Sequence, residues 1–246
     1  MVTDPMAAAV PESVVICGLG PSVRDYLTMC SSLGDRRKLA AETWGINSLG
    51  GVLQCDRLFH MDDVRIQEIR AAARPQSNIA NMLGWMRTAD VPIYSPRLHP
   101  DYPSLVEYPL QDVLNSCGYS YFNGTAAYAL AFAIHLGVKQ IGIWGCDYTY
   151  PNAHQAEKGR ACLEFWIAHG LARGLDIRIP DSTSLLDSCE GQPLYGYGVL
   201  GSRDAHIETV DGKAVVTFTE RQALPTADEI EAAYDHSRHP SPLIAS

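Results

Sequence analysis

Residues 14–22 read VVICGLGPS, an apolar and β-branched run that passes directly into a glycine-rich turn. The run predicts a short buried strand over residues 14–17, and the residues that follow predict a helix over 22–29 with Ser22 as its N-cap. In a strand-loop-helix unit the backbone amides of the loop and the positive end of the helix can face an anion. We therefore expect this loop to bind the phosphate of a nucleotide-type ligand through Gly18, Gly20, Pro21 and Ser22.

The loop completes neither of the two common phosphate-binding fingerprints. It lacks the third glycine of Gly-x-Gly-x-x-Gly, and no Gly-Lys-Ser or Gly-Lys-Thr follows it. A tight strand-to-helix turn without a ligand is the alternative interpretation.

The remainder of the chain alternates strands with helices, which is typical of an α/β fold with a parallel sheet. Further strands are predicted at 44–47, 57–61, 92–94, 105–107, 139–144 and 176–180, and further helices at 64–74, 124–136 and 157–173. We expect a Rossmann-like, doubly wound, mostly parallel sheet with helices on both faces, occupying residues 1–205. In residues 206–246 the dipeptide Asp211-Gly212 between two β-branched runs predicts a C-terminal β-hairpin appendage, followed by a short helix over 226–234 and a disordered tail.

Composition excludes several classes of protein. With 246 residues, 46% hydrophobic and 19% charged, the chain fits one globular domain with an appendage, and it has no apolar run of the ~18 residues that span a bilayer. The N-terminus lacks a basic region and a long apolar stretch, and seven scattered cysteines form no Cys-x-x-Cys pair, so a cytoplasmic protein with reduced thiols is expected. A net charge of −9 disfavours simple surface binding of nucleic acid.

Polar residues follow other predicted strands or begin helices, where they could contact the same ligand. Asn47 ends the second strand, and its amide suits a ribose or a base. The buried helix opens with Asn123, Gly124 and Thr125, whose free amides and hydroxyl could meet a phosphate. A turn asparagine and ordinary helix capping are the respective alternatives. Gly145 and Asp147 follow the strand at 139–144 and complete this set of candidate nucleotide-binding residues.

Three side chains near residue 150 could carry out chemistry. Phenol groups at Tyr148 and Tyr150 could donate hydrogen bonds to a leaving phosphate. His154, expected in a mobile loop, could act as a general base, although a lone loop histidine is more often simply exposed. Asp62 and Asp63, with His60, could hold Mg²⁺, but a solvated turn explains one acidic pair equally well.

Several short motifs in a fixed order carry a family resemblance over roughly residues 12–188. They are VVICGLGPS at 14–22, FNGTA at 122–126, QIGIWGCDY at 140–148, LEF at 163–165 and IPDSTSLL at 179–186. The pattern resembles the bacterial sialyltransferase-like proteins, which share a fold with the archaeal-type 6-hydroxymethylpterin diphosphokinases, and proteins of this look occur in bacteriophages.

The resemblance implies roles for individual residues. It places His154 near the catalytic base, Tyr148 and Tyr150 near the tyrosines that steady the departing phosphate, and Asn47 on the nucleotide. Leu19 stands where the sialyltransferases carry an asparagine, and the segment between Tyr150 and Lys158 is shorter than theirs. Both departures speak against sialic acid itself as the transferred sugar.

Together the sequence predicts a nucleotide-dependent transferase, most of all an inverting, sialyltransferase-like glycosyltransferase with a CMP- or UDP-type sugar donor and optional Mg²⁺. The alternatives are a Mg-ATP-dependent pyrophosphokinase of the 6-hydroxymethylpterin type, which would use Asp62, Asp63 or Asp147 for the metal, and a non-catalytic nucleotide-binding or assembly protein. In the last case the hairpin could pair with a partner or with a second copy as a homo-oligomer. The acceptor is not indicated.

Overall fold

The computed structural model describes residues 10–149, 152–190, 203–210, 213–220 and 226–233. The chain divides into two units, Met1–Cys189 and Glu190–Ser246, which we describe separately. The boundary expected after residue 205 stays a prediction. Tyr150 and the predicted disordered tail beyond residue 233 lie outside the described residues.

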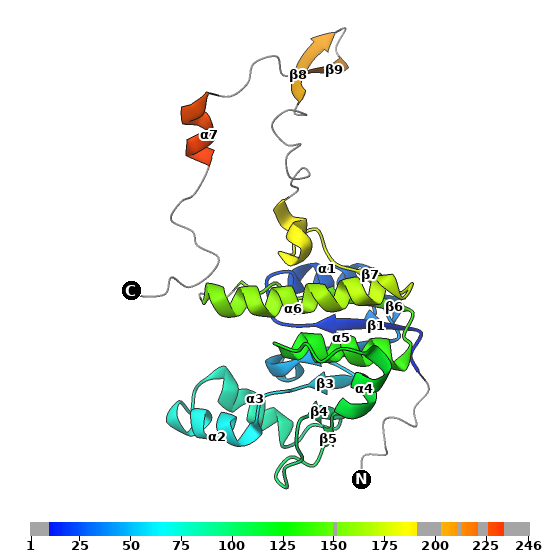
Figure 1. Cartoon of the computed structure of the whole chain (residues 1–246), viewed down its shortest axis with the longest axis vertical. Coiled ribbons are helices and arrows are strands. Elements are labelled where there is room, and N and C mark those ends of the chain that lie inside the picture. Colours follow the sequence, from blue (N-terminus) through cyan, green and yellow to red (C-terminus); the bar gives the residue numbers. More distant parts are fainter. Residues whose placement is uncertain (1–9, 150–151, 191–202, 211–212, 221–225, 234–246) are drawn as a thin grey trace. The chain divides into compact units, whose positions relative to one another are not determined.

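The first unit is built on a seven-stranded sheet in which every strand pair is parallel (Figure 1). Its spatial order is β5-β4-β3-β2-β1-β6-β7, so the predicted doubly wound parallel sheet is confirmed. The strands are β1 (Ser13–Cys17), β2 (Glu42–Ile46), β3 (Arg57–Phe59), β4 (Ile93–Ser95), β5 (Leu105–Glu107), β6 (Gln140–Trp144) and β7 (Asp176–Arg178).

Helices cover both faces of this sheet, and the alternation of side chains along β1 shows how. Val14 and Ile16 belong to the apolar cluster that contains residues of α4 (Leu110–Cys117), α5 (Thr125–Leu136) and α6 (Ala153–Ala172). Val15 and Cys17 point to the other face, where they pack with Tyr26 of α1 (Val23–Leu33). On that face α2 (Val64–Ala73) and α3 (Asn78–Met86) cover β3 and β4.

Helix α5 is the buried helix that the sequence predicts. Eight of its residues are buried, five of them alanines, and small side chains allow the helix to lie close to the sheet. Phe132 contacts an aromatic group on the strands, with ring centroids 5.8 Å from Trp44, 5.7 Å from Phe59 and 4.7 Å from Tyr94. This packing fixes where the N-terminus of α5 meets the carboxyl edge of the sheet.

Three local predictions were incomplete or wrong. Helices α3 and α4 were not predicted, because short helices that depend on tertiary packing give a weak periodic signal. Helix α6 begins at Ala153, since the Asn152 side chain accepts a hydrogen bond from the Gln155 amide and caps it there. His154 therefore lies in the first turn of a helix, and its predicted placement in a mobile loop was wrong.

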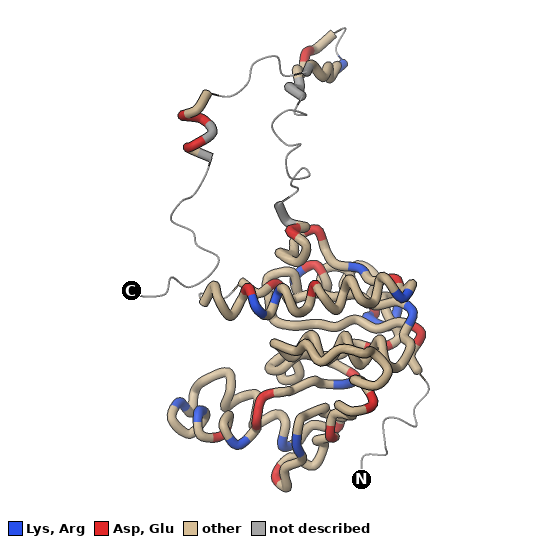
Figure 2. The backbone as a smooth tube through the Cα atoms, viewed as in Figure 1, with Lys and Arg blue, Asp and Glu red and all other residues tan. Residues whose placement is uncertain are grey.

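Among the described helices, none is both long enough and apolar enough to cross a membrane. Figure 2 shows Lys and Arg interspersed with Asp and Glu along the chain of the first unit.

The second unit contains the predicted hairpin and a short helix. Strands β8 (Arg203–Val210) and β9 (Lys213–Glu220) pair antiparallel, and α7 spans Ala227–Ala233. Ile207 lies directly opposite Val216, and both are exposed together with Phe218. An isolated two-stranded hairpin is only marginally stable in water, which favours pairing with another strand. Pairing of this hairpin with a partner or a second copy stays a prediction.

Candidate functional site

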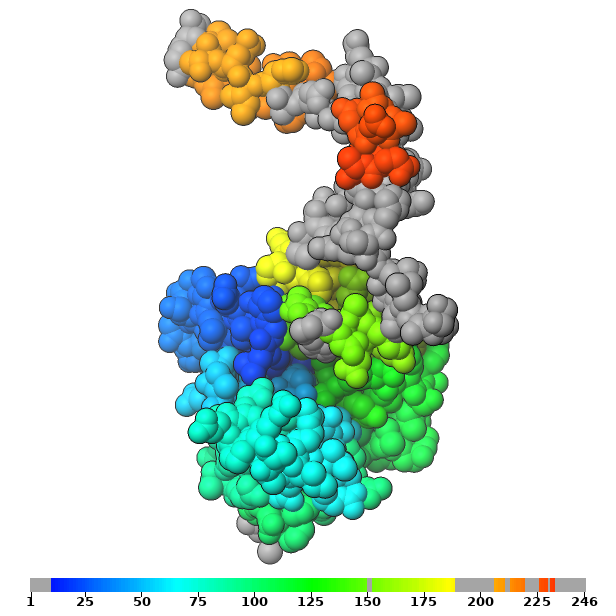
Figure 3. All heavy atoms as spheres, turned by 90° about the vertical axis from the view of Figure 1, so that its left-hand side faces the viewer, coloured from blue at the N-terminus to red at the C-terminus, as the bar shows by residue number. Residues whose placement is uncertain are grey.

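A cavity of about 560 Å³ opens at the carboxyl edge of the sheet, where β1 lies between β2 and β6. The chain leaves β1 toward β2 on one side and returns to β6 on the other, so the loops that follow diverge at this switch point. Figure 3 views the molecule from this side, with segments of the blue, cyan and green parts of the chain meeting there. The lining residues are Gly18, Leu19, Gly20, Pro21, Ile46, Asn47, Ser48, Asp62, Asn78, Gly124, Thr125, Ala126, Gly145, Cys146, Asp147, Tyr148 and Thr149.

One buried carboxylate ties the loop after β1 to the loop after β6. The Ser22 amide donates to Asp147 Oδ2 at 2.8 Å, and the Ser22 hydroxyl donates to Asp147 Oδ1 at 2.6 Å. The same hydroxyl accepts a hydrogen bond from the Gly145 amide at 2.7 Å. Ser22 and Asp147 are each only 2% exposed, so these bonds are shielded from water. We call this set of contacts the Ser22–Asp147 clamp.

Backbone contacts between the two loops explain the glycines. The Gly18 amide donates to the Trp144 carbonyl and the Gly20 amide to the Gly145 carbonyl. A Cβ atom on Gly18 would lie 2.3 Å from the Gly145 oxygen, and one on Gly20 would lie 2.5 Å from Asp147 Oδ2. Gly145 has φ +67° and would be equally blocked by the Gly18 carbonyl. These positions require glycine because the loops touch, whether or not a ligand is bound.

The first loop consequently offers less to a phosphate than the sequence suggests. The Gly18, Gly20 and Ser22 amides all donate to protein acceptors, and Pro21 has no amide hydrogen. Ser22 precedes α1 but its hydroxyl makes no capping bond, because it is used in the clamp. Ser22 occupies the N-cap position of α1, but the predicted capping bond from its side chain is absent. Phosphate binding by this loop stays a prediction, and the loop forms one wall of the cavity.

Helix α5 provides the amides that the first loop does not. Within the described part of the chain, the Thr125 and Ala126 amides have no hydrogen-bond partner, and both residues line the cavity. They occupy the first two positions of α5, where the helix dipole adds positive potential. The residue before them, Gly124, is extended, with φ −177° and ψ 154°. An anion in the cavity would meet this helix end.

Tyr148 is held beside the same helix end. Its backbone has φ +51°, an unusual conformation for a tyrosine. A Cβ added to Gly159 of α6 would lie 2.3 Å from the Tyr148 ring, and one added to Gly124 would lie 3.5 Å from its hydroxyl oxygen. The ring therefore fits against Gly159, with its hydroxyl near the start of α5. Strain of this kind concentrates at functional sites.

Asn47 presents a second unusual backbone, with φ +51°, at the end of β2. Its side-chain oxygen Oδ1 is buried and has no hydrogen-bond partner among the described residues. Buried acceptors in native proteins nearly always have a donor, so this oxygen is an exception. Asn47 lines the cavity, as does Asp62, which follows β3.

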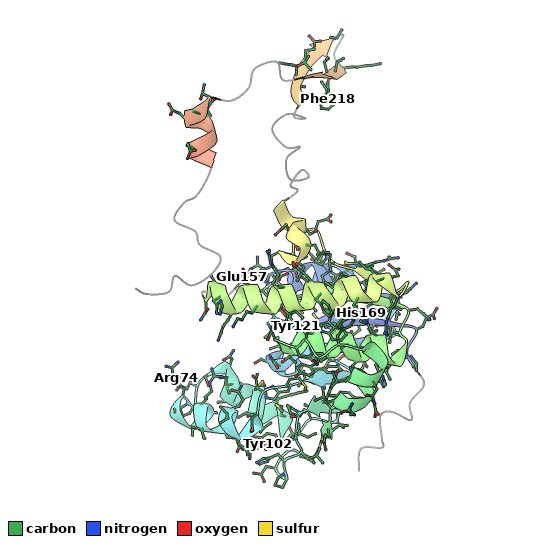
Figure 4. All side chains as sticks on the ribbon, in the orientation of Figure 1. Arg74, Tyr102, Tyr121, Glu157, His169 and Phe218 are labelled. Carbon is green, nitrogen blue, oxygen red and sulfur yellow. The ribbon has the colours of Figure 1, made fainter. Side chains whose placement is uncertain are left out.

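Some predicted residues do not reach the cavity. Ser22 lies buried behind its wall, and Asn123 is exposed, with its amide donating to Cys162 Sγ at 3.2 Å. His154 is half-buried in the first turn of α6 and does not line the cavity. Its Nδ1 is buried and has no partner among the residues that the structure describes. Figure 4 labels Glu157 near this end of α6 and His169 nearer the other end.

Asp62 and Asp63, the two carboxylates proposed to hold a metal, have different surroundings in the structure. Asp63 caps α2 by accepting from the Arg65 amide at 3.0 Å and pairs with the Arg65 guanidinium, which lowers the pKa of Asp63 to about 2. Asp62 faces the cavity instead. His60 is fully buried, and burial lowers the pKa of its ring, so it stays neutral near pH 7. Among the described residues, three other metal-ligating side chains lie close enough together to hold a metal ion, those of Glu68, His99 and Asp101.

The cavity also includes residues that the sequence interpretation missed. Asn78 arrives on α3, a helix that was not predicted, and no short motif marks it. Cys146 lies between two predicted site residues, and burial raises the pKa of its thiol, which makes it a poor nucleophile. Ala126 could have been found by extending the helix-start argument one residue beyond Thr125.

Comparison with known proteins adds little to this site. No protein family and no curated protein matches the sequence. Two solved structures of the sialyltransferase CstII from Campylobacter jejuni are similar, one with cytidine-5'-monophosphate and one with CMP-3FNeuAc. The identities are 14% and 16%, each TM-score is 0.42, and the alignments cover 90% and 89% of this chain and 98% and 97% of those chains. A likeness of this degree assigns no activity to this chain. It gives no support to the pterin-enzyme or bacteriophage resemblance.

Replacing Ser22 with alanine should destabilise the protein by about 2–4 kcal/mol, because it leaves Asp147 Oδ1 and the Gly145 amide without partners in a buried place. Chemical denaturation measures the free energy of unfolding. The matched control is Ser182→Ala, whose hydroxyl bonds Asp25 on the surface and should change stability by less than about 0.5 kcal/mol. An equal decrease in the free energy of unfolding in the two variants would show that the buried clamp stabilises the protein no more than a surface hydrogen bond does.

Proposed function

We propose that this protein is a nucleotide-dependent transferase, and most specifically a glycosyltransferase that takes a sugar from a donor with one phosphate, of the CMP type. The observation that carries the proposal is the start of α5, with the unpaired Thr125 and Ala126 amides beside the Tyr148 hydroxyl in a cavity at the sheet switch point. Amides at a helix N-terminus and a phenol together suit a phosphate oxygen.

The charges of the cavity favour a single phosphate. None of the described residues that line it is Lys or Arg. Arg160 on α6 is already engaged with the Ser184 carbonyl and the Asp187 carboxylate. A helix end supplies roughly half of one positive charge, which matches the single negative charge of a CMP-sugar better than the charge of a UDP-sugar or ATP. A UDP-type donor is therefore the second choice.

The proposed reaction is a direct displacement at the sugar carbon. The acceptor oxygen attacks the sugar carbon while the bond between this carbon and the phosphate oxygen breaks. The nucleotide leaves with the electron pair of that bond. The Thr125 and Ala126 amides and the Tyr148 hydroxyl stabilise the charge that develops on the leaving phosphate, with Tyr150 as a second phenol. His154, at the start of α6, is the proposed base that takes the acceptor proton. The transfer is inverting because a single displacement, with attack opposite the leaving phosphate, reverses the configuration at the sugar carbon.

The rival pyrophosphokinase reaction needs carboxylates that can hold Mg²⁺ against two phosphates. Both Asp147 oxygens accept hydrogen bonds from Ser22, and Asp63 is paired with Arg65. Asp62 and Asp147 both line the cavity. Of the three carboxylates, only that of Asp62 accepts no hydrogen bond from a described residue. The geometry therefore favours the glycosyltransferase, with Mg²⁺ optional.

Nucleotide binding can be tested by thermal unfolding of the protein with CMP, UDP, GDP, ADP and ATP, each with and without Mg²⁺. We expect CMP to stabilise without metal, by about 2.7 kcal/mol at 100 times its dissociation constant. Stabilisation by ATP only in the presence of Mg²⁺ would favour the pyrophosphokinase. No stabilisation by any nucleotide would contradict the proposed function.

Thr125→Pro should remove one amide donor and leave α5 intact. Proline is favoured at the first helical position, and the extended backbone of Gly124 suits the residue before a proline. We expect the affinity for CMP to fall about 10-fold or more, the loss of one hydrogen bond to a charged acceptor. Calorimetric titration gives the dissociation constant. Thr125→Ala keeps the amide and serves as control, and an equal loss there would place the contact on the side chain.

His154→Ala separates an enzyme from a non-catalytic binding protein. We expect release of CMP from a CMP-sugar to slow by about 10²–10⁴-fold with an acceptor present, because the base is lost, while the dissociation constant of CMP changes less than about 2-fold. Replacement of the exposed His206 is the matched control. Unchanged turnover in His154→Ala would remove this residue from the mechanism.

A further inference from the structure

Helix α2 turns its large apolar side chains toward solvent and a polar one toward the protein. Ile66 and Ile69 are 55% and 68% exposed, whereas Gln67 is 5% exposed. Side chains three and four residues apart share one face of a helix, so Ile66, Ile69 and the exposed Ala73 form one outward row. We call this row the α2 stripe. Surface helices usually turn such a row toward the core, so the orientation of α2 is unusual.

The α2 stripe takes no part in the packing of the described residues. Neither isoleucine belongs to one of their apolar clusters. The inward side of α2 is held by other groups, because the Glu68 carboxylate accepts hydrogen bonds from the Tyr102 hydroxyl and the Arg87 guanidinium, each at 2.9 Å. Val64 adds a buried apolar contact on that side. The fold therefore does not depend on the two isoleucines.

Arginines flank the α2 stripe. With 3.6 residues per turn, Arg65 lies on one side of the stripe and Arg70 on the other. Arg74 follows the helix directly and is exposed (Figure 4). Arg65 pairs with Asp63, whereas Arg70 and Arg74 form no ion pair with a described residue. Two arginines next to the stripe are thus available to an external anion.

The loop after β4 extends the same face. Arg97 and Leu98 line a small hollow together with Arg65, so they lie beside the start of α2. Leu98 is 62% exposed, and Arg97 is exposed as well. The face therefore continues beyond the helix with the same combination of apolar side chains and arginines.

The charge of this region is opposite to that of the whole chain. Residues 64–98 contain five arginines, no lysine and two acidic residues, Glu68 and Asp90, which gives a net charge of +3 in a chain of net −9. Figure 2 shows the blue residues along α2 and α3. A local excess of positive charge attracts an anionic surface even where the chain as a whole is acidic.

Size and symmetry favour a bilayer over a protein as this anionic partner. The α2 stripe is one helix face about 15 Å long and about 10 Å wide, well below the roughly 800 Å² that each partner contributes to a stable protein interface. In a two-fold dimer through this face, the arginines of one copy would meet those of the other. A bilayer needs no matching pocket, since a few inserted apolar side chains and cations near lipid phosphates give reversible binding.

We propose that the α2 stripe docks this protein reversibly on the surface of a membrane that contains anionic lipid. Helix α2 lies along that surface, Ile66 and Ile69 enter the boundary between headgroups and acyl chains, and the arginines beside them contact lipid phosphates. The docking face lies outside the nucleotide cavity, so this proposal does not depend on the proposed function.

Co-sedimentation of the full chain with vesicles measures its partition coefficient on phosphatidylcholine alone and on phosphatidylcholine with about 30% phosphatidylglycerol. Wild type should bind the anionic vesicles about 10-fold or more tightly than the neutral ones, and raising NaCl from about 0.1 M to about 0.5 M should weaken this binding. The double variant Ile66→Gln with Ile69→Gln should bind anionic vesicles about 10-fold more weakly, because the apolar insertion is lost. Arg70→Gln with Arg74→Gln should show a similar loss and a smaller dependence on NaCl.

Two controls separate this face from other exposed apolar groups. Leu171→Gln replaces a leucine on α6 that is 48% exposed, and it should bind as wild type does. Phe218→Ser removes the most exposed aromatic side chain of the hairpin and should also match wild type. Thermal unfolding followed by circular dichroism should be the same in both double variants as in wild type, since the replaced side chains are exposed.

Several outcomes would overturn the proposal. They are absence of wild-type binding to anionic vesicles, equal binding to neutral vesicles, and undiminished binding by the isoleucine double variant. Loss of binding in Phe218→Ser, with the isoleucine variant unchanged, would assign the contact to the hairpin instead. Equal affinity of wild type for soluble polyglutamate and for vesicles, with no loss in the isoleucine variant, would indicate an acidic polypeptide as the partner and would likewise overturn the membrane proposal.

Discussion

The buried carboxylate of Asp147 holds together two loops that would otherwise diverge from neighbouring strands. It accepts both the amide and the hydroxyl of Ser22, and the hydroxyl in turn fixes the Gly145 amide. The loops then approach so closely that Gly18 and Gly145 meet backbone to backbone. Breaking a shielded network of this kind leaves several polar groups unpaired at once, which is why it can fix one loop arrangement. The floor and one wall of the cavity follow from it.

The contacts between the two loops also limit which backbone donors are available in the cavity. The Ser22 amide is bonded to Asp147 and the Gly18 and Gly20 amides are bonded to carbonyls, whereas the Thr125 and Ala126 amides at the start of α5 have no partner among the described residues. Tyr148 reaches that helix end because its ring fits against Gly159. The cavity thus has free amide donors of α5 on one side and the polar residues Asn47, Asp62 and Asn78 on the other.

Much of the sheet could be predicted from the sequence, because strands buried on both faces appear as short apolar runs between glycines and polar residues. The β1 run, the buried α5 and the hairpin are examples. The clamp could not be predicted, since Ser22 and Asp147 are far apart in the chain and their contact depends on the strand order. Gly18 and Gly20 look the same in sequence whether they contact a ligand or another loop. Asn78 depends on the packing of Trp85 against Gly50, which no local pattern reveals.

The central claim is that phosphate binds the start of α5 and not the glycine loop after β1. Titration of ¹⁵N-labelled protein with CMP, followed by amide chemical shifts, tests it directly. We predict large, saturable changes at the Thr125 and Ala126 amides, whose donors are free, and much smaller changes at Gly20 and Ser22, whose amides stay bonded to Gly145 and Asp147. Large changes at Gly20 and Ser22 with none at Thr125 and Ala126 would contradict the account.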